Sequence, residues 1–140
     1  IGAYTRCAYE SQFVDSNFHF VLNMKTGNVT RRESEILIGK CNWIGNRTSI
    51  TKGSKTKDFS IICAGSLMNK DYTQNEENFI MLGGSPAKVL TSGLKRIFST
   101  EIEKDIIYFF NNNPKANNYN LTSELSDDFK DIHYWFEHMM

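Results

Sequence analysis

The stretch that decides the fold runs from residue 38 to residue 68 and reads IGKCNWIGNRTSITKGSKTKDFSIICAGSLM. In steps of six, the first position holds Ile38, Ile44, Ile50, Thr56, Ile62 and Met68. Four residues after each of the first five stands a small polar residue, namely Asn42, Thr48, Ser54, Ser60 and Ser66. A period of six fits neither an α-helix nor a simple strand alternation. It is typical of a solenoid in which three short strands and their corners, about eighteen residues, form one coil.

The two repeated positions suggest a packing scheme. The aliphatic residue would fill the solenoid interior, and the small residue would fit where that interior is crowded. Gly39 and Gly45 follow the first position, where we expect glycine to relieve backbone strain near a corner. The repeat at Thr56 is weak because it lacks the aliphatic residue and the glycine. The same register runs from Ile1 to Phe18, and because the chain opens inside the pattern we expect further repeats before it.

The register breaks between His19 and Glu35. This segment holds a turn signal at residues 26–28 (Thr-Gly-Asn) and a charged run at residues 31–35. We therefore predict a loop over about residues 20–35, extruded from a corner of the solenoid. Insertions of this kind often form the binding face of a repeat protein.

The repeat ends after Lys70, and the last third of the chain changes character. Residues 79–82 predict a short apolar strand, and residues 83–86 a turn. From Leu94, apolar residues at helical spacing predict a helix that ends at residues 111–114 (Asn-Asn-Asn-Pro). A second helix is predicted over about residues 123–136. We expect a mainly β domain over 1–90 and a helical extension over 91–140.

Composition excludes several classes of protein. Sixteen basic residues balance sixteen acidic ones, so no electrostatic argument favours a nucleic acid or an anionic membrane as partner. Cys7, Cys41 and Cys63 form no C-x-x-C pair, and we expect reduced thiols in a cytoplasmic protein. The three histidines are not spaced to complete a metal site with them, so we expect no metal. No apolar run is long enough to predict a membrane span.

Three motifs in the chain resemble those of hexapeptide-repeat acetyltransferases. Residues 38–45 (IGKCNWIG) resemble the family's I-G-x-x-x-W-I-G. Residues 64–71 (AGSLMNKD) resemble A-G-S-V-V-T-K-D, and residues 83–90 (GGSPAKVL) resemble G-G-x-P-A-K-V-I. Residues 15–19 (DSNFH) resemble the D-x-D-x-H element of the branch that acetylates surface polysaccharides and similar sugars, with Asn17 in place of the second Asp.

This resemblance covers roughly residues 1–90 and implies the fold and the reaction. The family fold is a left-handed parallel β-helix, and family members act as homotrimers with sites between subunits. The resemblance implies acetyl-CoA as the donor and a sugar or saccharide-like molecule as the acceptor. It places His19 as the general base, a role for which imidazole is well suited near neutral pH. Transfer would be direct, since no Ser or Cys stands in a nucleophile motif.

The resemblance also implies residues that hold the two substrates. Asp15 and Asn17 would orient the imidazole or hold the acceptor, and Trp43 would stand beside the thioester. The positions that match the coenzyme A groove are Asn46, Ala64, Asn69, Lys70 and Lys88. The two lysines would meet the phosphates. Thr91 stands where relatives often carry an arginine, and Lys95 or Arg96 is the substitute that the sequence offers.

Other interpretations remain open from the sequence. Asp15 could be a solvated corner residue, and Trp43 could be an outward aromatic residue at a subunit contact. N-acetylation of an amino sugar would use similar base chemistry. A non-catalytic β-helix that binds or assembles is a second class, which the departures at Asn17 and Thr91 would suit. The zinc carbonic anhydrase of this fold needs three histidines in the repeats, and only His19 lies there.

Overall fold

The computed structural model describes residues 1–121 and divides the chain into two compact units, Ile1–Arg96 and Ile97–Met140. The strands of the first unit are β1 (Arg6–Cys7), β2 (Gln12–Val14), β3 (Trp43–Ile44), β4 (Ser49–Thr51), β5 (Ile61–Ile62), β6 (Leu67–Met68), β7 (Met81–Gly84) and β8 (Ala87–Thr91). The described part of the second unit contains α1 (Thr100–Asn112).

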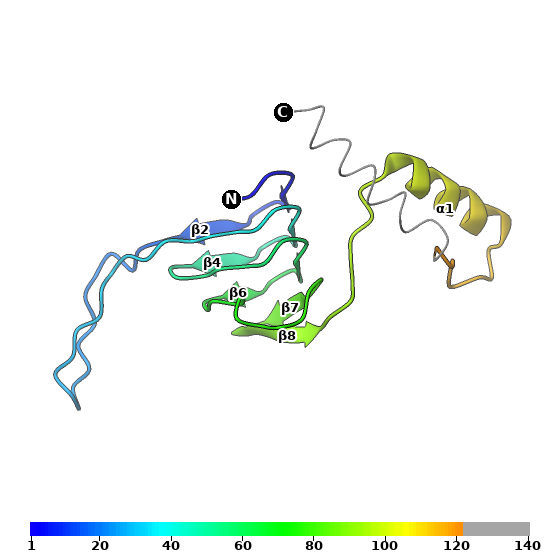
Figure 1. The fold of residues 1–140 in the computed structure, drawn as a ribbon. Helices are drawn as coiled ribbons and strands as arrows, with labels where there is room; N and C mark the ends of the chain where they lie inside the picture. The colour runs from blue at the N-terminus through cyan, green and yellow to red at the C-terminus, as the bar shows by residue number, and fades with distance from the viewer. Residues whose placement is uncertain (122–140) are drawn as a thin grey trace. The chain divides into compact units, whose positions relative to one another are not determined.

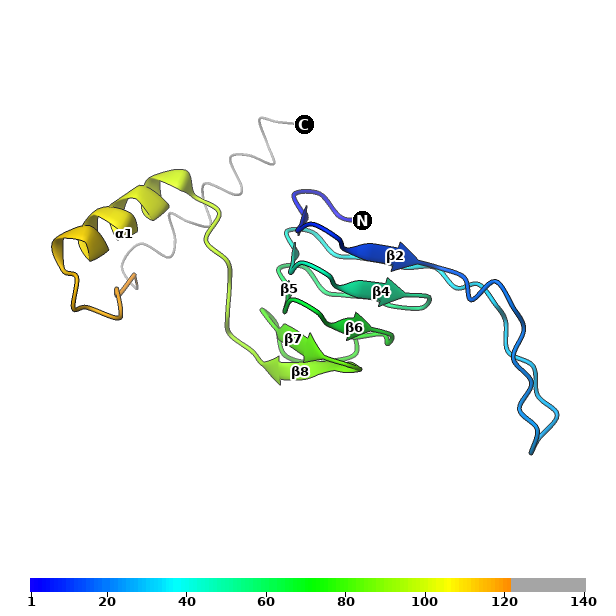
Figure 2. The same ribbon diagram turned by 180° about the vertical axis from the view of Figure 1, so that it is seen from behind.

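The strands of the first unit form two sheets, ordered β1-β3-β5-β7-β8 and β2-β4-β6. Every pairing is parallel except that of β7 with β8. Trp43 pairs with Ile61, eighteen positions further along, and Ser49 pairs with Leu67 at the same separation. Parallel bridges from Leu37 to Lys55 to residue 71 form a third column. The predicted mainly β fold is confirmed, and Figures 1 and 2 show its layers from two sides.

The repeat predicted the core of this unit. Ile44 lies between Cys7 and Ile62 in the first ladder, and Ile50 lies between Phe13 and Met68 in the second. The first-position residues of the repeat are buried from Ile38 to Met68. Burying one such aliphatic side chain is worth about 1.5–3 kcal/mol, so the stacks supply much of the stability. Cys7 and Phe13, in the first layer, remain exposed.

The small polar residues of the repeat are buried, and they do more than save space. Their hydroxyl groups donate to the carbonyl oxygen three residues earlier: Thr48 to Gly45, Ser54 to Thr51, Ser60 to Lys57 and Ser66 to Cys63, at 2.6–2.8 Å. Each bond pairs the buried hydroxyl group with a backbone acceptor at a corner. The position therefore requires a short side chain that is also a donor.

The weak repeat at Thr56 has a physical explanation. Thr56 is buried, its hydroxyl donates to Oδ1 of Asn42 at 2.7 Å, and it accepts from the backbone N–H of Gly39 at 3.1 Å. The amide of Asn42 donates in turn to the carbonyl oxygens of residues 40 and 57. A fully paired polar contact thus replaces an aliphatic one inside the unit, which avoids the cost of unpaired buried groups.

The reason we expected for the repeat glycines was wrong. Gly45 does not adopt a positive φ; instead, a Cβ there would lie 2.4 Å from the backbone N of Ala64. At Gly39 a Cβ would lie 2.6 Å from the N of Asp58. Glycine is required at both positions because the backbone of the next layer comes too close for any side chain.

Non-glycine residues occupy most of the left-handed corners. At one corner, Glu10 and Arg47 have φ values of 60° and 55°, and Gly65 follows in the next layer at 72°. Glu10 and Arg47 also form an ion pair, with Oε2 and Nε 2.6 Å apart. The corner conformation therefore tolerates side chains.

This contrast generates a stability prediction. Gly45→Ala places a methyl group against backbone that cannot move away, so we expect a loss of about 3 kcal/mol or more in the free energy of unfolding. Gly65→Ala is the matched control, because its Cβ would meet open space and only the left-handed conformation costs, about 1 kcal/mol. Urea unfolding followed by circular dichroism measures both. Equal losses would contradict the close-approach explanation.

The extruded loop is an antiparallel arm that leaves the stacked strands after β2 (Figure 1). Isolated bridges join Ser16 to Glu33 and Leu22 to Val29, and the chain turns between residues 23 and 28. The backbone N–H of Ser34 already bonds to the carbonyl oxygen of Asp15. The arm therefore begins about five residues before the predicted loop.

The end of the first unit is a hairpin, of which the sequence predicted the first strand and the turn but not the second strand. The strands β7 and β8 pair antiparallel, with Gly84 opposite Ala87 and a cis peptide bond between Ser85 and Pro86. The hydroxyl of Tyr72, which is buried, donates to the carbonyl oxygen of Ala87 at 2.9 Å. This bond connects the segment that follows the last repeat to the hairpin.

The predicted helix from Leu94 begins six residues later, at Thr100. Residues 94–99 have no regular secondary structure, and the backbone N–H of Leu94 bonds to the carbonyl oxygen of Phe79. Ser99 is the N-cap: its hydroxyl accepts from the N–H of Ile102, and acidic residues follow in the first turn. The predicted helix over 123–136 lies outside the described residues. In the described residues, no helix has the length and apolar character needed to cross a membrane.

Candidate active site

The base of the arm lies at the corner where β2, β4 and β6 end. Gln12, Ser49 and Leu67 stand in register in these strands. Asp15 directly follows β2, Lys52 directly follows β4, and Lys70 lies two residues after the end of β6. The structure thus gathers the D-x-N-x-H segment and one of the predicted cofactor lysines at one edge.

His19 stands at the base of the arm with its side chain exposed. A sharp bend precedes it: Phe18 has a φ of 63°, and its N–H bonds to the hydroxyl of Ser16 at 3.0 Å. The N–H of His19 donates to the carbonyl oxygen of Asn17 at 2.7 Å. The N–H of Asn17 donates in turn to the carbonyl oxygen of Arg32 on the returning strand. Asp15, Asn17 and His19 therefore share one short, hydrogen-bonded stretch.

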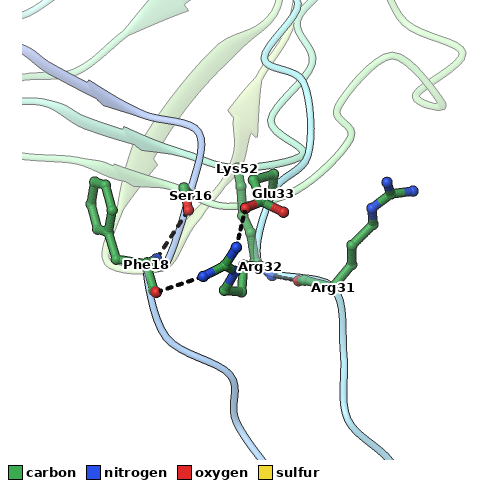
Figure 3. A network of polar contacts seen from close by, with 6 residues as sticks. All are labelled: Ser16, Phe18, Arg31, Arg32, Glu33 and Lys52. Atoms are coloured by element: carbon green, nitrogen blue, oxygen red, sulfur yellow. Dashed lines mark hydrogen bonds and ion pairs between the residues drawn. The ribbon is translucent and has the colours of Figure 1, made fainter.

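A polar network on the returning strand holds this stretch, and the sequence analysis missed it (Figure 3). The guanidinium of Arg32 donates from Nη1 to the carbonyl oxygen of Phe18 at 3.3 Å and lies 4.6 Å from the ring centroid of Phe20. Its Nη2 lies 3.2 Å from Oε1 of Glu33. The charged run at residues 31–35 was the only signal, and it was interpreted simply as loop.

A lysine from the strand layer below anchors the arm. Nζ of Lys52 donates to the carbonyl oxygen of Arg31 at 2.6 Å (Figure 3). Lys52 follows β4 directly, so this bond connects the second strand of the arm to the stacked unit. Charge-assisted bonds to a carbonyl oxygen are short and comparatively strong. The sequence offered no reason to single out Lys52 among the lysines of the repeat.

A second group of predicted site residues lies at the opposite end of the β2-β4-β6 sheet. Asn46 follows β3, and its carbonyl oxygen accepts from the N–H of Gly65 at 2.9 Å. Ala64 precedes Gly65 and has an exposed side chain. Trp43 opens β3, is 44% exposed, and its ring centroid lies 5.6 Å from the guanidinium carbon of Arg96. These residues line the corner where the chain passes from one sheet to the other.

The remaining predicted residues are divided between two places. Asn69 and Lys70 are exposed just after β6, on the same corner as the arm. Lys88 is exposed in β8, where it pairs with Gly83. The two corners are therefore separated by the short strands β4 and β6, about 10 Å of extended chain for three residues. The structure does not bring all of the predicted residues into one closed pocket.

A pocket of about 500 Å³ in the first unit contains none of the predicted residues. It is lined by Thr56, Lys57, Asp58, Phe59, Asn78 and Phe79. Nζ of Lys95 lies 5.7 Å from the centroid of the Phe59 ring. Lys95 therefore lies with the aromatic residues of this pocket, whereas Arg96 lies with Trp43.

Two titratable groups lie close to the predicted cofactor residues. The hydroxyl of Thr73 donates to the carboxylate of Asp71, and this bond lowers the pKa of Asp71 below its usual value. Asp71 is therefore ionised beside Lys70 at neutral pH. Burial raises the pKa of the Tyr72 hydroxyl, which keeps it protonated as the donor to Ala87. Within residues 1–121 no group of three His, Cys, Asp or Glu side chains could hold a metal ion.

Comparisons with known proteins address the fold. The chain is similar to the solved structure of the polySia-specific acetyltransferase NeuO, with a TM-score of 0.56 and 22% identity over 65% of this chain and 40% of that one. For the polysialic acid O-acetyltransferase OatWY, the TM-score is 0.57 and the identity 20%, over 76% of this chain and 51% of that one. For a galactoside acetyltransferase in complex with coenzyme A, the TM-score is 0.50 and the identity 24%, over 65% of this chain and 43% of that one.

The chain shares the fold of these three acetyltransferases. It spans about half or less of the length of each of them. No family model matches the sequence, and no curated protein matches it either.

The placement of Arg96 generates a spectroscopic prediction. Because its guanidinium covers one face of the Trp43 ring, Arg96→Ala should increase the quenching of Trp43 fluorescence by acrylamide. The experiment requires Trp135→Phe in every sample, since the chain has two tryptophans. Lys95→Ala removes an equal charge beside Phe59 and serves as the control. If acrylamide quenches Trp43 fluorescence equally in both variants and in the parent, the Arg96 contact does not shield the ring.

Proposed function

We propose that the chain is part of a left-handed parallel β-helix acetyltransferase, which moves an acetyl group from acetyl-CoA to a hydroxyl of a sugar or saccharide-like acceptor. The observation that carries the proposal is the hydrogen-bonded stretch of Asp15, Asn17 and His19 at the corner shared with Lys70. The fold shared with acetyltransferases of polysialic acid and galactosides supports the choice of reaction and of acceptor class.

In the proposed reaction His19 is the general base. Its imidazole removes the proton of the acceptor hydroxyl while the oxygen attacks the thioester carbonyl carbon. The tetrahedral intermediate then expels the coenzyme A thiolate, which takes up a proton from the imidazolium. A backbone N–H would stabilise the oxyanion. The exposed side chain of His19 leaves the imidazole accessible to an acceptor as large as a polysaccharide.

The proposed path of acetyl-CoA crosses the outer face of the β2-β4-β6 sheet. This face separates Asn46 and Ala64 from Asn69 and Lys70, so a ligand that touches all four must lie across it. Alternation along β4 buries Ile50 and directs its neighbours outward. An extended pantetheine arm fits such a shallow surface, and Lys70 and Lys88 are the proposed phosphate contacts.

We further propose that the active enzyme is a homotrimer with each site between two subunits. The open arrangement of the predicted residues supports this, because water must be displaced from a thioester site for its electrostatic contacts to be strong. A neighbouring subunit packed along the β2-β4-β6 face would enclose the groove. Trp43 could then contact either the thioester or the neighbour.

The first test is acetyl transfer itself. Thiol release from acetyl-CoA is measured with polysialic acid, maltose, a galactoside and glucosamine, for the full chain and for His19→Ala. We expect one saccharide to drive release, and His19→Ala to lower kcat by at least about 100-fold, the usual contribution of a general base. Binding of coenzyme A should persist in the variant. A protein blank is needed because Cys7 is exposed.

Different outcomes separate the alternatives. If glucosamine is acetylated on its nitrogen, the proposed reaction is N-acetylation and not O-acetylation. Turnover that survives His19→Ala would exclude His19 as the base. If coenzyme A neither binds nor turns over with any acceptor, the enzymatic proposal fails and a non-catalytic β-helix module takes its place.

The cofactor path makes a separate prediction. Lys70→Met keeps the aliphatic length of the side chain and removes its charge, so we expect coenzyme A to bind about tenfold more weakly, as one charge-assisted bond is lost. Lys25→Met, at the exposed tip of the arm, is the control for the change in net charge. Isothermal titration with coenzyme A measures both. Equal affinities of the two variants would exclude Lys70 as a phosphate contact.

A further inference from the structure

We propose that Arg32 is a positioning residue for His19, an inference that rests on the proposed function. The side chain of Arg32 contacts the residue on each side of His19. Its Nη1 donates to the carbonyl oxygen of Phe18 at 3.3 Å, and its guanidinium carbon lies 4.6 Å from the centroid of the Phe20 ring. Arg32 lies on the returning strand of the arm and thus contacts the segment that carries the imidazole on both sides of His19 (Figure 3).

The main chain of Arg32 also contacts the segment that carries His19. Its carbonyl oxygen accepts from the N–H of Asn17 at 3.0 Å. One residue therefore contacts the stretch before, beside and after the bend at Phe18. That bend needs such support, because a positive φ is unfavourable for a residue with a large side chain. The bond from the N–H of Phe18 to Ser16 closes the bend on the other side.

Lys52 connects Arg32 and its contacts to the stacked strands. Nζ of Lys52 holds the carbonyl oxygen of Arg31, the residue directly before Arg32. Lys52 follows β4, whose middle residue Ile50 is fully buried. A continuous chain of contacts thus runs from the core through Lys52 to Arg32 and on to the backbone around His19. Without it, only the hydrogen bonds within the arm would hold His19 at its distance from the β2-β4-β6 face.

Arginine suits this place for a physical reason. The guanidinium is planar and carries several donors, so it can stack on Phe20 and donate to Phe18 and Glu33 at once. Lysine can supply one of these hydrogen bonds, but its ammonium group is not planar and cannot stack on the Phe20 ring. Arg32→Lys should therefore retain part of the function, which separates a specific contact from net charge alone.

The inference predicts an effect on chemistry rather than on cofactor binding. A misplacement of about 1 Å in a catalytic group can cost about 100-fold in rate. We expect Arg32→Ala to lower kcat by about 10- to 100-fold and to leave the KM for acetyl-CoA unchanged, with Arg32→Lys in between. Arg31→Ala is the matched control, because its side chain points away from the network in Figure 3 and the change in charge is the same.

The experiment combines kinetics with a readout that needs no turnover. The {¹H}-¹⁵N heteronuclear NOE of the backbone amides of residues 17–20 reports fast motion at the bend. In Arg32→Ala this NOE should fall, while it stays at the wild-type value in Arg31→Ala and is partly restored in Arg32→Lys. Unchanged circular dichroism in all variants shows that the stacked strands are intact, since Arg32 lies outside the core.

The outcomes are distinct. If Arg32→Ala matches Arg31→Ala in either the NOE or kcat, Arg32 does not position His19 and the inference is overturned. If the wild type transfers acetyl to no acceptor, the proposed function fails; the NOE then decides alone whether Arg32 orders the bend. A fall in both quantities, with the KM for acetyl-CoA constant, supports the inference.

Discussion

The close vertical approach of successive backbone layers is the constraint on which the rest of the structure depends. Parallel strands must bond at about 4.8 Å, and eighteen residues must return the chain to the same place one layer down. At Gly45 the layers come so near that no Cβ fits above Ala64. The corner hydroxyl groups, as at Ser66, are buried by this tight path and are paired with backbone carbonyl oxygens.

The same constraint explains how the arm can be inserted without disturbing the core. Arg6 pairs with Trp43 across the whole excursion, in the same ladder in which Trp43 pairs with Ile61. The insertion leaves and rejoins at a corner, so no ladder bond is lost. A rigid stack can therefore carry a variable segment at its edge, which is where function is commonly placed in repeat folds. The proposed base, His19, stands on this segment.

The interior of the stack is not purely apolar. Asn42 and Thr56 form a buried polar pair that satisfies backbone groups in two layers. In a region of low dielectric such a pair is stable only when every donor and acceptor has a partner, so it also specifies which layers face each other. The proposed acetyl-CoA face lies on the opposite, outward side of the strands, where the side chains are free to differ from layer to layer.

The amino-acid sequence by itself determined the repeat, the buried positions from Ile38 to Met68 and the approximate place of the insertion, because the spacing of aliphatic and small polar residues shows the period of six directly. It predicted the helix start six residues too early, because the apolar spacing from Leu94 does not show that Ser99 is the N-cap. For the candidate site, motifs identified His19 and its neighbours. Only the tertiary structure placed Arg32 on Phe18 and Lys52 on Arg31, because these contacts depend on the pairing register of the arm. The apolar side chains of the arm are exposed, so no buried face specifies that register.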